Sequence, residues 1–335
     1  MPETDLPPPD LDVVNVGMMA GEISPPRLGL RIDESDHLVL YAGGSATIFV
    51  LALAKLGGKI GFISKVGDDQ LGRWLRRMLR ELGVETEAIA VVPGQFTPMQ
   101  LASVDEEGNK TFYFYRFPGY CDPLATLRAD EISDDFLARG RVFDLSEGSL
   151  REPNLRRASM ALARRARDLG RIICFNPNFR VVSWAGGAAE ATAVLGEALT
   201  LADLTIMNEA EALLLSGAGT LAEAASWMQR HGPPLTVITS GRQPTLVLHD
   251  GHVHEIPAFD VEVVYDIGAG DVFHAGFLAA WRPGDDPLPA ARFAAAAAAI
   301  KIGRPPQSEY MPTRAEALAF LRDRGIDVSA LENRT

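Results

Sequence analysis

The chain alternates along its length between the hydrophobic period of a strand and that of a helix. From about residue 140 onward, apolar runs rich in Val and Ile (RVFDLSE, RIICFNP, ADLTIMN and PLTVITSG) alternate with segments of helical spacing such as NLRRASMALARRARDLG and LAEAASWMQRHG. Short apolar strands separated by helices are typical of a parallel sheet covered by helices. The pattern therefore predicts an α/β fold with a mostly parallel central sheet.

Two stretches in the first third of the chain do not fit this rhythm. Residues 27–42 and 97–116 have the pattern of hairpins, and the second has β-branched and aromatic residues around a Glu-Gly-Asn turn. We expect them to form a small β-sheet lid over the carboxyl ends of the parallel strands, where open α/β sheets bind ligands. The acidic, Pro-rich residues 1–10 are expected to be a disordered leader, and residues 11–330 to form one domain.

Composition and charge narrow the classes of function. The 335 residues carry a net charge of -12, which argues against non-specific binding to nucleic acid or to anionic membranes. No stretch reaches the roughly 18 apolar residues of a membrane span, and the N-terminus lacks the basic and apolar regions of a signal peptide. Cys121 and Cys174 are the two cysteines, so we expect no disulfide framework and a cytoplasmic location.

The segment YDIGAGDVFHAGF, residues 265–277, carries the clearest candidate chemistry. If a helix begins at Asp271, the N–H groups of residues 268–271 converge at its positive end and form an anion site. Asp271 can then take a proton from a substrate hydroxyl, or it can be an N-cap worth about 1 kcal/mol, and the motif alone admits both. The apolar helix behind it must be buried, where an ionised carboxylate is costly without a task; this favours the base.

Other motifs exclude or weaken alternative sites. The chain has no G-x-x-x-x-G-K-[ST], and Phe273 stands where the third glycine of a dinucleotide-binding G-x-G-x-x-G would be, so neither a P-loop nor a nicotinamide site is expected. His249, His252 and His254 surround an Asp-Gly turn, which predicts a tight hairpin; a metal site is geometrically possible there, and a solvated hairpin tip is the simpler interpretation. His274 is expected to pack within the buried helix.

Five motifs in order make the chain resemble the ribokinase-like, or PfkB, carbohydrate kinases over nearly its whole length. They are AGGSATIFVLALAKLG, VGDDQLGRWLRRMLRELGV, FNPNFR, NEAEA and YDIGAGDVFHAGF. The resemblance implies a three-layer ribokinase-like fold with a small β lid, and phosphoryl transfer from ATP with Mg²⁺. It also implies, by analogy, a homodimer formed through the lid.

The resemblance assigns roles position by position. Asp271 would be the general base, and Gly268, Ala269 and Gly270 would form the anion hole around the transferring phosphoryl group. Asn208 and Glu211 would organise Mg²⁺ through its waters, although both also fit an ordinary helix cap with an early acid. Thr239 and Gly241 would lie beside the nucleotide. The substrate-binding positions would be Glu22, Gly43, Gly44, Arg116, Asn178 and Arg180.

Several positions depart from the family pattern. They are Glu22 for a sugar-binding Asp, Ile48 for an Asn, Asn176 for the Asp of Asp-Pro-Asn, Tyr265-Asp266-Ile267 for a segment containing Asp-Thr, and Pro305-Pro306 for the Gly-Ala near a monovalent-cation site. Ribokinase or fructokinase specificity is therefore doubtful, and the need for a monovalent cation stays open. The arginines near the expected sugar site would suit an acidic substrate, as in the branch that acts on 2-keto-3-deoxygluconate.

Three rival functions remain at this point, of which an oxidoreductase is disfavoured by the missing third glycine and by the lack of an acid at the expected offset. A nucleoside kinase of the same family would be favoured by Ile48 and Phe49, which suit an apolar base. A catalytically silent sugar-binding homologue would explain the altered sugar-facing positions, but the retained Asp271, Asn208 and Glu211 argue against it. The expected acceptor is a small sugar or sugar acid, with no nucleic acid or membrane partner.

Overall fold

The computed structural model describes residues 8–115, 122–180, 184–305 and 311–332. Within them, a nine-stranded sheet runs in the order β13-β12-β11-β10-β9-β8-β1-β4-β5. Its strands are β1 (Leu11–Val16), β4 (Ile60–Gly67), β5 (Ile89–Val92), β8 (Gly140–Ser146), β9 (Ile172–Asn176), β10 (Leu204–Asn208), β11 (Leu235–Ser240), β12 (Gln243–His249) and β13 (His252–Ile256). Every pairing from β5 to β11 is parallel, and β12 and β13 extend the sheet as an antiparallel hairpin.

Alternate residues of the central strands enter two separate cores. Val13 and Val142 pack into the core on one face, whereas their neighbours Val14 and Phe143 pack into the core on the other. Successive side chains of a strand point to opposite faces, so strands that are apolar throughout require helices on both faces. This confirms the predicted α/β fold with a mostly parallel, helix-covered sheet.

The helices divide between these two faces. One core receives side chains of α1 (Ser45–Lys55), α2 (Gln70–Glu81), α8 (Ala269–Ala280), α9 (Pro287–Ile302), α10 (Arg314–Arg322) and α11 (Ser329–Glu332). The other receives side chains of α3 (Asp134–Arg139), α4 (Pro153–Asp168), α5 (Gly187–Leu201), α6 (Glu209–Ser216) and α7 (Leu221–His231). None of the described helices is both long enough and apolar enough to cross a bilayer.

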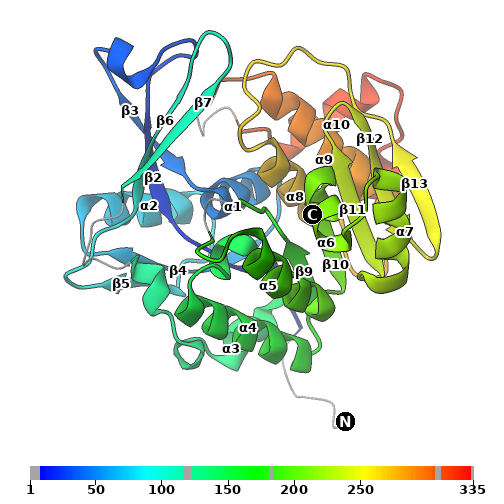
Figure 1. Cartoon of the computed structure of the whole chain (residues 1–335), viewed down its shortest axis with the longest axis horizontal. Helices are drawn as coiled ribbons and strands as arrows, with labels where there is room; N and C mark the ends of the chain where they lie inside the picture. Colours follow the sequence, from blue (N-terminus) through cyan, green and yellow to red (C-terminus); the bar gives the residue numbers. More distant parts are fainter. Residues whose placement is uncertain (1–7, 116–121, 181–183, 306–310, 333–335) are drawn as a thin grey trace.

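A second, four-stranded sheet stands away from this body (Figure 1). Its order is β3-β2-β6-β7, with β2 (Ala20–Ser24), β3 (Val39–Gly43), β6 (Met99–Val104) and β7 (Lys110–Tyr115). The hairpin predicted over 97–116 is present as β6 and β7. The first predicted hairpin is wrong in its first strand: β2 ends at Ser24, and residues 25–38 form an excursion with a short 3₁₀ turn at Ile32–Glu34. The polar residues there satisfy one another locally and do not form a ladder, as in the pairing of Arg31 with Asp33.

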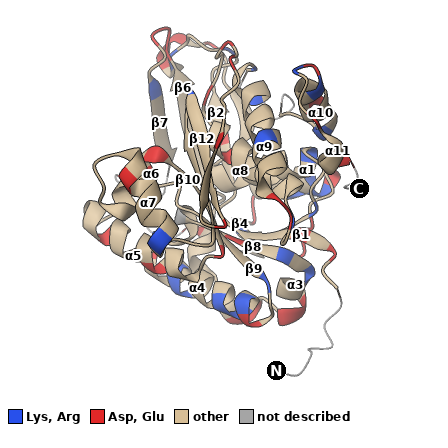
Figure 2. Ribbon diagram, turned by 90° about the vertical axis from the view of Figure 1, so that its right-hand side faces the viewer, with Lys and Arg blue, Asp and Glu red and all other residues tan. Residues whose placement is uncertain are grey.

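The start of the domain is also held more firmly than its composition suggested. Asp10, which we assigned to the leader, forms a two-pronged ion pair with Arg139, with N–O distances of 3.1 and 3.0 Å. Acidic and basic residues intermix along α3 and α4 (Figure 2), where Arg165 pairs with Asp134 at 2.6 Å. These pairs connect α3 to the residue that precedes β1 and to α4.

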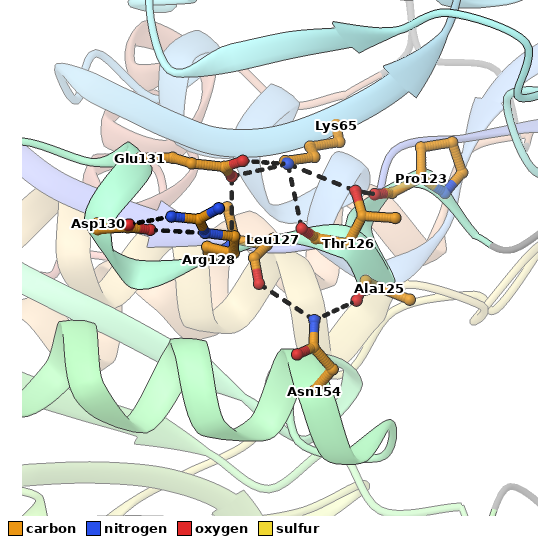
Figure 3. Close-up of polar contacts among 9 residues, drawn as sticks. All are labelled: Lys65, Pro123, Ala125, Thr126, Leu127, Arg128, Asp130, Glu131 and Asn154. Atoms are coloured by element: carbon orange, nitrogen blue, oxygen red, sulfur yellow. Dashed lines mark hydrogen bonds and ion pairs between the residues drawn. The ribbon is translucent and has the colours of Figure 1, made fainter.

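The chain that follows the small sheet is fixed by a buried lysine. Lys65 of β4 is 6% exposed and donates to the Thr126 carbonyl at 3.2 Å and to Glu131 at 2.7 Å (Figure 3). Asn154 of α4 donates to the carbonyl of Ala125 at 2.6 Å in the same cluster. Together these bonds hold residues 123–131 against the main sheet.

Candidate active site

Asp271 lies in the first turn of α8 at the carboxyl end of the parallel strands. Its Oδ1 accepts hydrogen bonds from Ser45 Oγ, at the start of α1, and from Asn178 Nδ2 at 3.5 Å. Among the described residues, its Oδ2 has no hydrogen-bond partner. Burial raises the pKa of Asp271 to about 6, against the opposing effects of the Ser45 bond and of the charges of His274, Arg180 and Lys301.

The helix begins two residues earlier than we predicted. Gly268 is its N-cap with φ 81°, and Ala269 is its first residue, so Asp271 is not the cap. A side chain at Gly268 would be strained and would meet Ile48, whereas one at Gly270 would meet nothing within 4 Å. The Ala269 N–H bonds to the Asp266 carbonyl at 3.1 Å, which leaves the Gly270 and Asp271 amides without a partner inside the helix.

A large cavity of about 580 Å³ opens on one side of Asp271. Its lining includes Glu22, Gly44, Ile48, Arg151, Asn178 and Arg180. Arg180 packs over Phe112 of β7, with its guanidinium carbon 5.8 Å from the ring centroid. The small sheet and the carboxyl ends of the main sheet therefore both contribute to this cavity.

One cross-strand row of the small sheet faces this cavity. Tyr41, Glu22, Gln100 and Phe114 are successive partners across β3, β2, β6 and β7, and the last three line the cavity. Gln100 Nε2 donates to Glu22 Oε2 at 2.5 Å, and Ser24 donates to Oε1 at 3.3 Å. Burial raises the pKa of Glu22, while these bonds and the charge of Lys301 oppose the rise. Gln100 and Ser24 thus fix the Glu22 carboxylate at the wall of the large cavity.

A smaller cavity of about 160 Å³ lies on the other side of Asp271. Asn208, Glu211, Thr239, Ala269 and Gly270 line it. The two cavities share Asn178, Arg180, Gly268 and Asp271. The carboxylate therefore stands at the boundary between two spaces that could hold two different molecules.

Asn208 and Glu211 form the helix cap that the sequence permitted. Asn208 Oδ1 accepts from the Glu211 N–H at 3.0 Å, and Glu211 Oε2 accepts from the Asn208 N–H at 2.9 Å. Glu211 Oε1 also accepts from the Phe179 N–H at 2.8 Å. Burial is the main cause of the raised pKa of Glu211, and the charge of Asp271 adds to it. This box fixes the start of α6 and links it to the FNPNFR segment.

Some of the other predicted site residues line one of the two cavities, and others do not. Gly44 lines the large cavity, but Gly43 does not; a side chain there would collide with Glu22, so Gly43 makes room for that residue. Thr239 lines the small cavity, whereas Gly241 lies at the exposed turn after β11 and is not part of the lining. Arg116 lies outside the described residues.

His274 packs within the buried helix α8, as the sequence predicted. His274 is buried in α8, stacks on Phe49 with centroids 4.4 Å apart, and contacts Asp144 at 2.9 Å and Cys174 at 3.5 Å. Among the described residues, Asp144, Cys174 and His274 are the one group of possible metal ligands whose ligand atoms lie within 4.8 Å of one another, and His274 contacts both of the others. Burial raises the pKa of the Cys174 thiol well above its usual value.

The hairpin histidines do not form such a group. His249 pairs with His252 across the predicted two-residue turn, in which Asp250 and Gly251 both have positive φ. The His252 ring nitrogen bonds to the Asp250 carbonyl at 2.9 Å, and His249 contacts the Asp250 carboxylate at 3.3 Å. The tight hairpin is confirmed, and His249 and His252 contact Asp250 of their own turn.

Sequence reasoning missed Ser45, Gln100, Arg151 and Lys301 as parts of this region. Ser45 immediately follows Gly44, so its place at a helix start was a usable signal. Gln100 lies in the 97–116 hairpin and Lys301 in an Ala-rich helix. At each position, a polar residue between two apolar neighbours was the only signal. Nothing local distinguished Arg151 from the other arginines of the chain.

Comparison with known proteins places this site in a family. Residues 12–314 match the family model described as pfkB family carbohydrate kinase. The chain is 28% identical over 319 residues to "Fructokinase-1" of Zea mays, covering 92% of this chain and 97% of that protein. It is 26% identical over 322 residues to "5-dehydro-2-deoxygluconokinase" of Clostridium tetani, covering 94% of each.

A solved structure agrees in fold. The structure titled "Crystal Structure of Fructokinase with bound ATP from Xylella fastidiosa" superposes with a TM-score of 0.82 at 23% identity, covering 93% of this chain and 99% of that one. This likeness, at low identity, establishes the ribokinase-like fold. The chain therefore belongs to the pfkB family of carbohydrate kinases, and it is an ATP-dependent sugar kinase of that family.

Proposed function

We propose that the chain phosphorylates a hydroxyl of a small sugar acid, with Asp271 as the general base. One observation carries this proposal: Asp271 and Gly268 line both cavities. An acceptor in the larger cavity and a phosphoryl donor in the smaller one would then meet at the carboxylate. In-line transfer requires this arrangement, because catalysis of phosphoryl transfer is mostly positioning and electrostatics.

The proposed reaction uses the two carboxylate oxygens differently. Ser45 and Asn178 hold Oδ1, so Oδ2 is the oxygen that takes the proton from the acceptor hydroxyl. The acceptor oxygen forms the new bond to phosphorus, and the bond from phosphorus to the ADP oxygen breaks with its electron pair. The amides of Gly270 and Asp271, at the positive end of α8, would stabilise the charge that develops on the phosphoryl oxygens.

The small cavity has oxygen ligands that would suit Mg-ATP. Its oxygens come from Asn208, Glu211 and Thr239, and hard divalent cations prefer such ligands. Because both Glu211 oxygens already accept backbone amides, we propose that Asn208 and Glu211 hold Mg²⁺ through water. When bound, Mg²⁺ would neutralise charge on the donor phosphates.

The arginines of the large cavity support an acidic acceptor. Arg151 and Arg180 both line it, and guanidinium groups bind carboxylates in two-pronged fashion. Glu22 lies on the small-sheet wall and would accept from sugar hydroxyls. The relative named 5-dehydro-2-deoxygluconokinase acts, by that name, on a keto-deoxy sugar acid, which is the class we propose here.

A substrate screen with one matched variant tests the proposal. We expect ADP release with keto-deoxy aldonic acids to exceed that with ketoses and nucleosides. Asp271→Asn should keep the fold and lower kcat by about 10²- to 10⁴-fold, the usual effect of a general base. Asp260→Asn, at an exposed position, is the control. Near-normal turnover of Asp271→Asn would refute the role of Asp271 as the general base. A preference for nucleosides as acceptors would favour a nucleoside kinase of the same family.

We also propose that two copies associate through the small sheet. The row Leu40, Ile23, Leu101 and Tyr113 lies on the face opposite Glu22, and Leu40 and Tyr113 are 43% and 55% exposed. An apolar row on an otherwise polar surface is typical of an interface. A homodimer would cover it.

A further inference from the structure

Lys301 is a buried lysine beside the proposed transfer site. It lies one residue before the end of α9, is 3% exposed, and donates from Nζ to the Tyr265 carbonyl at 3.0 Å. Its ammonium also lies 4.5 Å from the centroid of the Tyr265 ring. Burial of a lone ammonium is costly, so a lysine in this place requires compensating interactions.

Those interactions come from several elements. The carboxylates of Asp266, Asp271 and Glu22 favour the charged form of Lys301, and the ammonium of Lys110 on β7 opposes it. Burial outweighs them and lowers the pKa of Lys301 to about 8. Among the described residues, the Tyr265 phenol also belongs to the ring that lies beside Lys301, and burial raises the pKa of that phenol.

The segment before α8 is held from two sides. The N–H groups of Val264 and Tyr265 donate to the Ile302 carbonyl at 2.7 and 2.9 Å, and the Lys301 ammonium binds the Tyr265 carbonyl. From the small sheet, Lys110 pairs with Asp266 at 2.6 Å. The Asp266 carbonyl in turn accepts from the Ala269 N–H, so the position of this segment determines where the first turn of α8 lies.

We propose that Lys301 is a positioning residue for phosphoryl transfer: its ammonium holds residues 264–268 in place and supplies a fixed positive charge beneath the anion hole. This inference rests on the proposed function. Three carboxylates already surround the site, and a phosphoryl group adds further negative charge. Without Lys301 this segment loses its buried positive charge, so the rate of phosphoryl transfer should fall more than the affinity for the sugar.

Kinetics of Lys301 variants test this role. Lys301→Met should lower kcat by about 10- to 100-fold, with a smaller change in the sugar KM. Lys301→Ala leaves a cavity beside the Tyr265 carbonyl, and ammonium or potassium chloride should restore part of its kcat, whereas choline chloride at equal ionic strength should not. Wild-type kcat should not respond to this exchange of salts.

The pH profile gives a second readout. Wild-type kcat should rise as pH increases through about 6, where Asp271 ionises, and should fall through about 8, where Lys301 loses its proton. Lys301→Arg keeps its charge at every working pH, so the alkaline limb should disappear in that variant. A role in packing alone would leave the alkaline limb unchanged.

Lys65→Met is the matched control. Lys65 is also a buried lysine bonded to a backbone carbonyl, but it holds residues 123–131 (Figure 3). Neither Lys65 nor residues 123–131 line either cavity. It should lower thermal stability without changing kcat or creating a response to small cations. Hydrogen exchange should become faster around residues 263–270 in Lys301→Met, and around residues 123–131 in Lys65→Met.

The outcomes separate the two proposals. Absence of ADP release by the wild type with every acceptor would refute the proposed function, and hydrogen exchange would still report on the Lys301 contact. The role of Lys301 is refuted if Lys301→Met keeps kcat within about two-fold of wild type. It is equally refuted if Lys301→Ala is inactive without cation rescue while exchange around residues 263–270 is unchanged.

Discussion

At the scale of single residues, the environment of Asp271 favours reactivity over stability. The carboxyl is packed at a helix start between two cavities, and burial raises its pKa to about 6. A folded pKa above the unfolded value means that the folded protein binds the proton more tightly. The favourable contribution of Asp271 is therefore present below about 3.8 and is lost as pH rises through about 6.

The raised pKa of Asp271 in the folded state predicts how a substitution there changes stability with pH. Asp271→Asn should raise the free energy of unfolding by about 1–3 kcal/mol above pH 6, because the amide removes the cost of a buried charge. The gain should shrink as pH falls below 6 and vanish only well below pH 3.8, where the wild-type carboxyl is protonated in both the folded and the unfolded state. Urea unfolding at the two pH values measures it, and a variant that is less stable at both would contradict this view of the site.

Glu22 offers the corresponding prediction for the acceptor. Glu22→Gln should raise the sugar KM by about 10- to 100-fold and change kcat less, because a hydrogen bond to a charged group is worth about 1.5–3 kcal/mol. The carboxylate is fixed by Gln100 and Ser24, so little rearrangement can compensate. Steady-state kinetics with Glu106→Gln, at the exposed hairpin turn, provide the control. An unchanged KM would place the acceptor elsewhere in the cavity.

At the scale of elements, the cap formed by Asn208 and Glu211 shows how one pair can fit two interpretations. The NEAEA motif admitted either a helix cap or a metal-organising pair. The structure forms the cap and also places both residues in the small cavity. A cap fixes the direction of the side chains and the helix start together, so the structural role is compatible with the proposed role of this pair in organising Mg²⁺.

The segment after the small sheet provides an element-scale prediction. Lys65→Met should lower the free energy of unfolding by about 1–2 kcal/mol, because it removes bonds to Thr126 and Glu131 while Glu131 stays partly hydrated. Differential scanning calorimetry measures the loss. Arg128→Met breaks a fully exposed pair with Asp130 in the same turn and should have little effect. Equal losses would mean that the turn is held by packing alone.

Local sequence signals located most elements but not all of their boundaries. The strands after residue 140 follow directly from apolar runs, because a parallel strand buried on both faces must be apolar throughout. The excursion at residues 25–38 was misread, because its apolar residues alternate as in a strand while local polar bonds hold it as a loop. The start of α8 was missed by two residues, because glycines permit several paths into a helix.

At the scale of the whole molecule, the small sheet has two different faces. One faces the large cavity through Glu22, Gln100 and Phe114, and the other carries the exposed row of Leu40 and Tyr113. The same small sheet thus carries a wall of the proposed acceptor site on one face and the proposed dimer surface on the other. Association of two copies would therefore also stiffen that wall.

The dimer prediction follows from the outer row. Tyr113→Lys should shift the chain from dimer to monomer in light scattering coupled to size-exclusion chromatography, because a charge in an apolar interface is costly to bury. Tyr113→Phe keeps the apolar surface and should stay dimeric. A wild-type chain that elutes as a monomer at high concentration would refute the interface.

The sequence by itself determined the layered α/β fold and the GAGD turn, because strand burial and glycine geometry leave local marks in composition and spacing. Only the tertiary structure decided what surrounds that turn. Ser45, Asn178 and Lys301 come from positions 226, 93 and 30 residues away from Asp271 along the chain. Their approach depends on how parallel strands and their helices are ordered across the sheet, and no local pattern encodes that order.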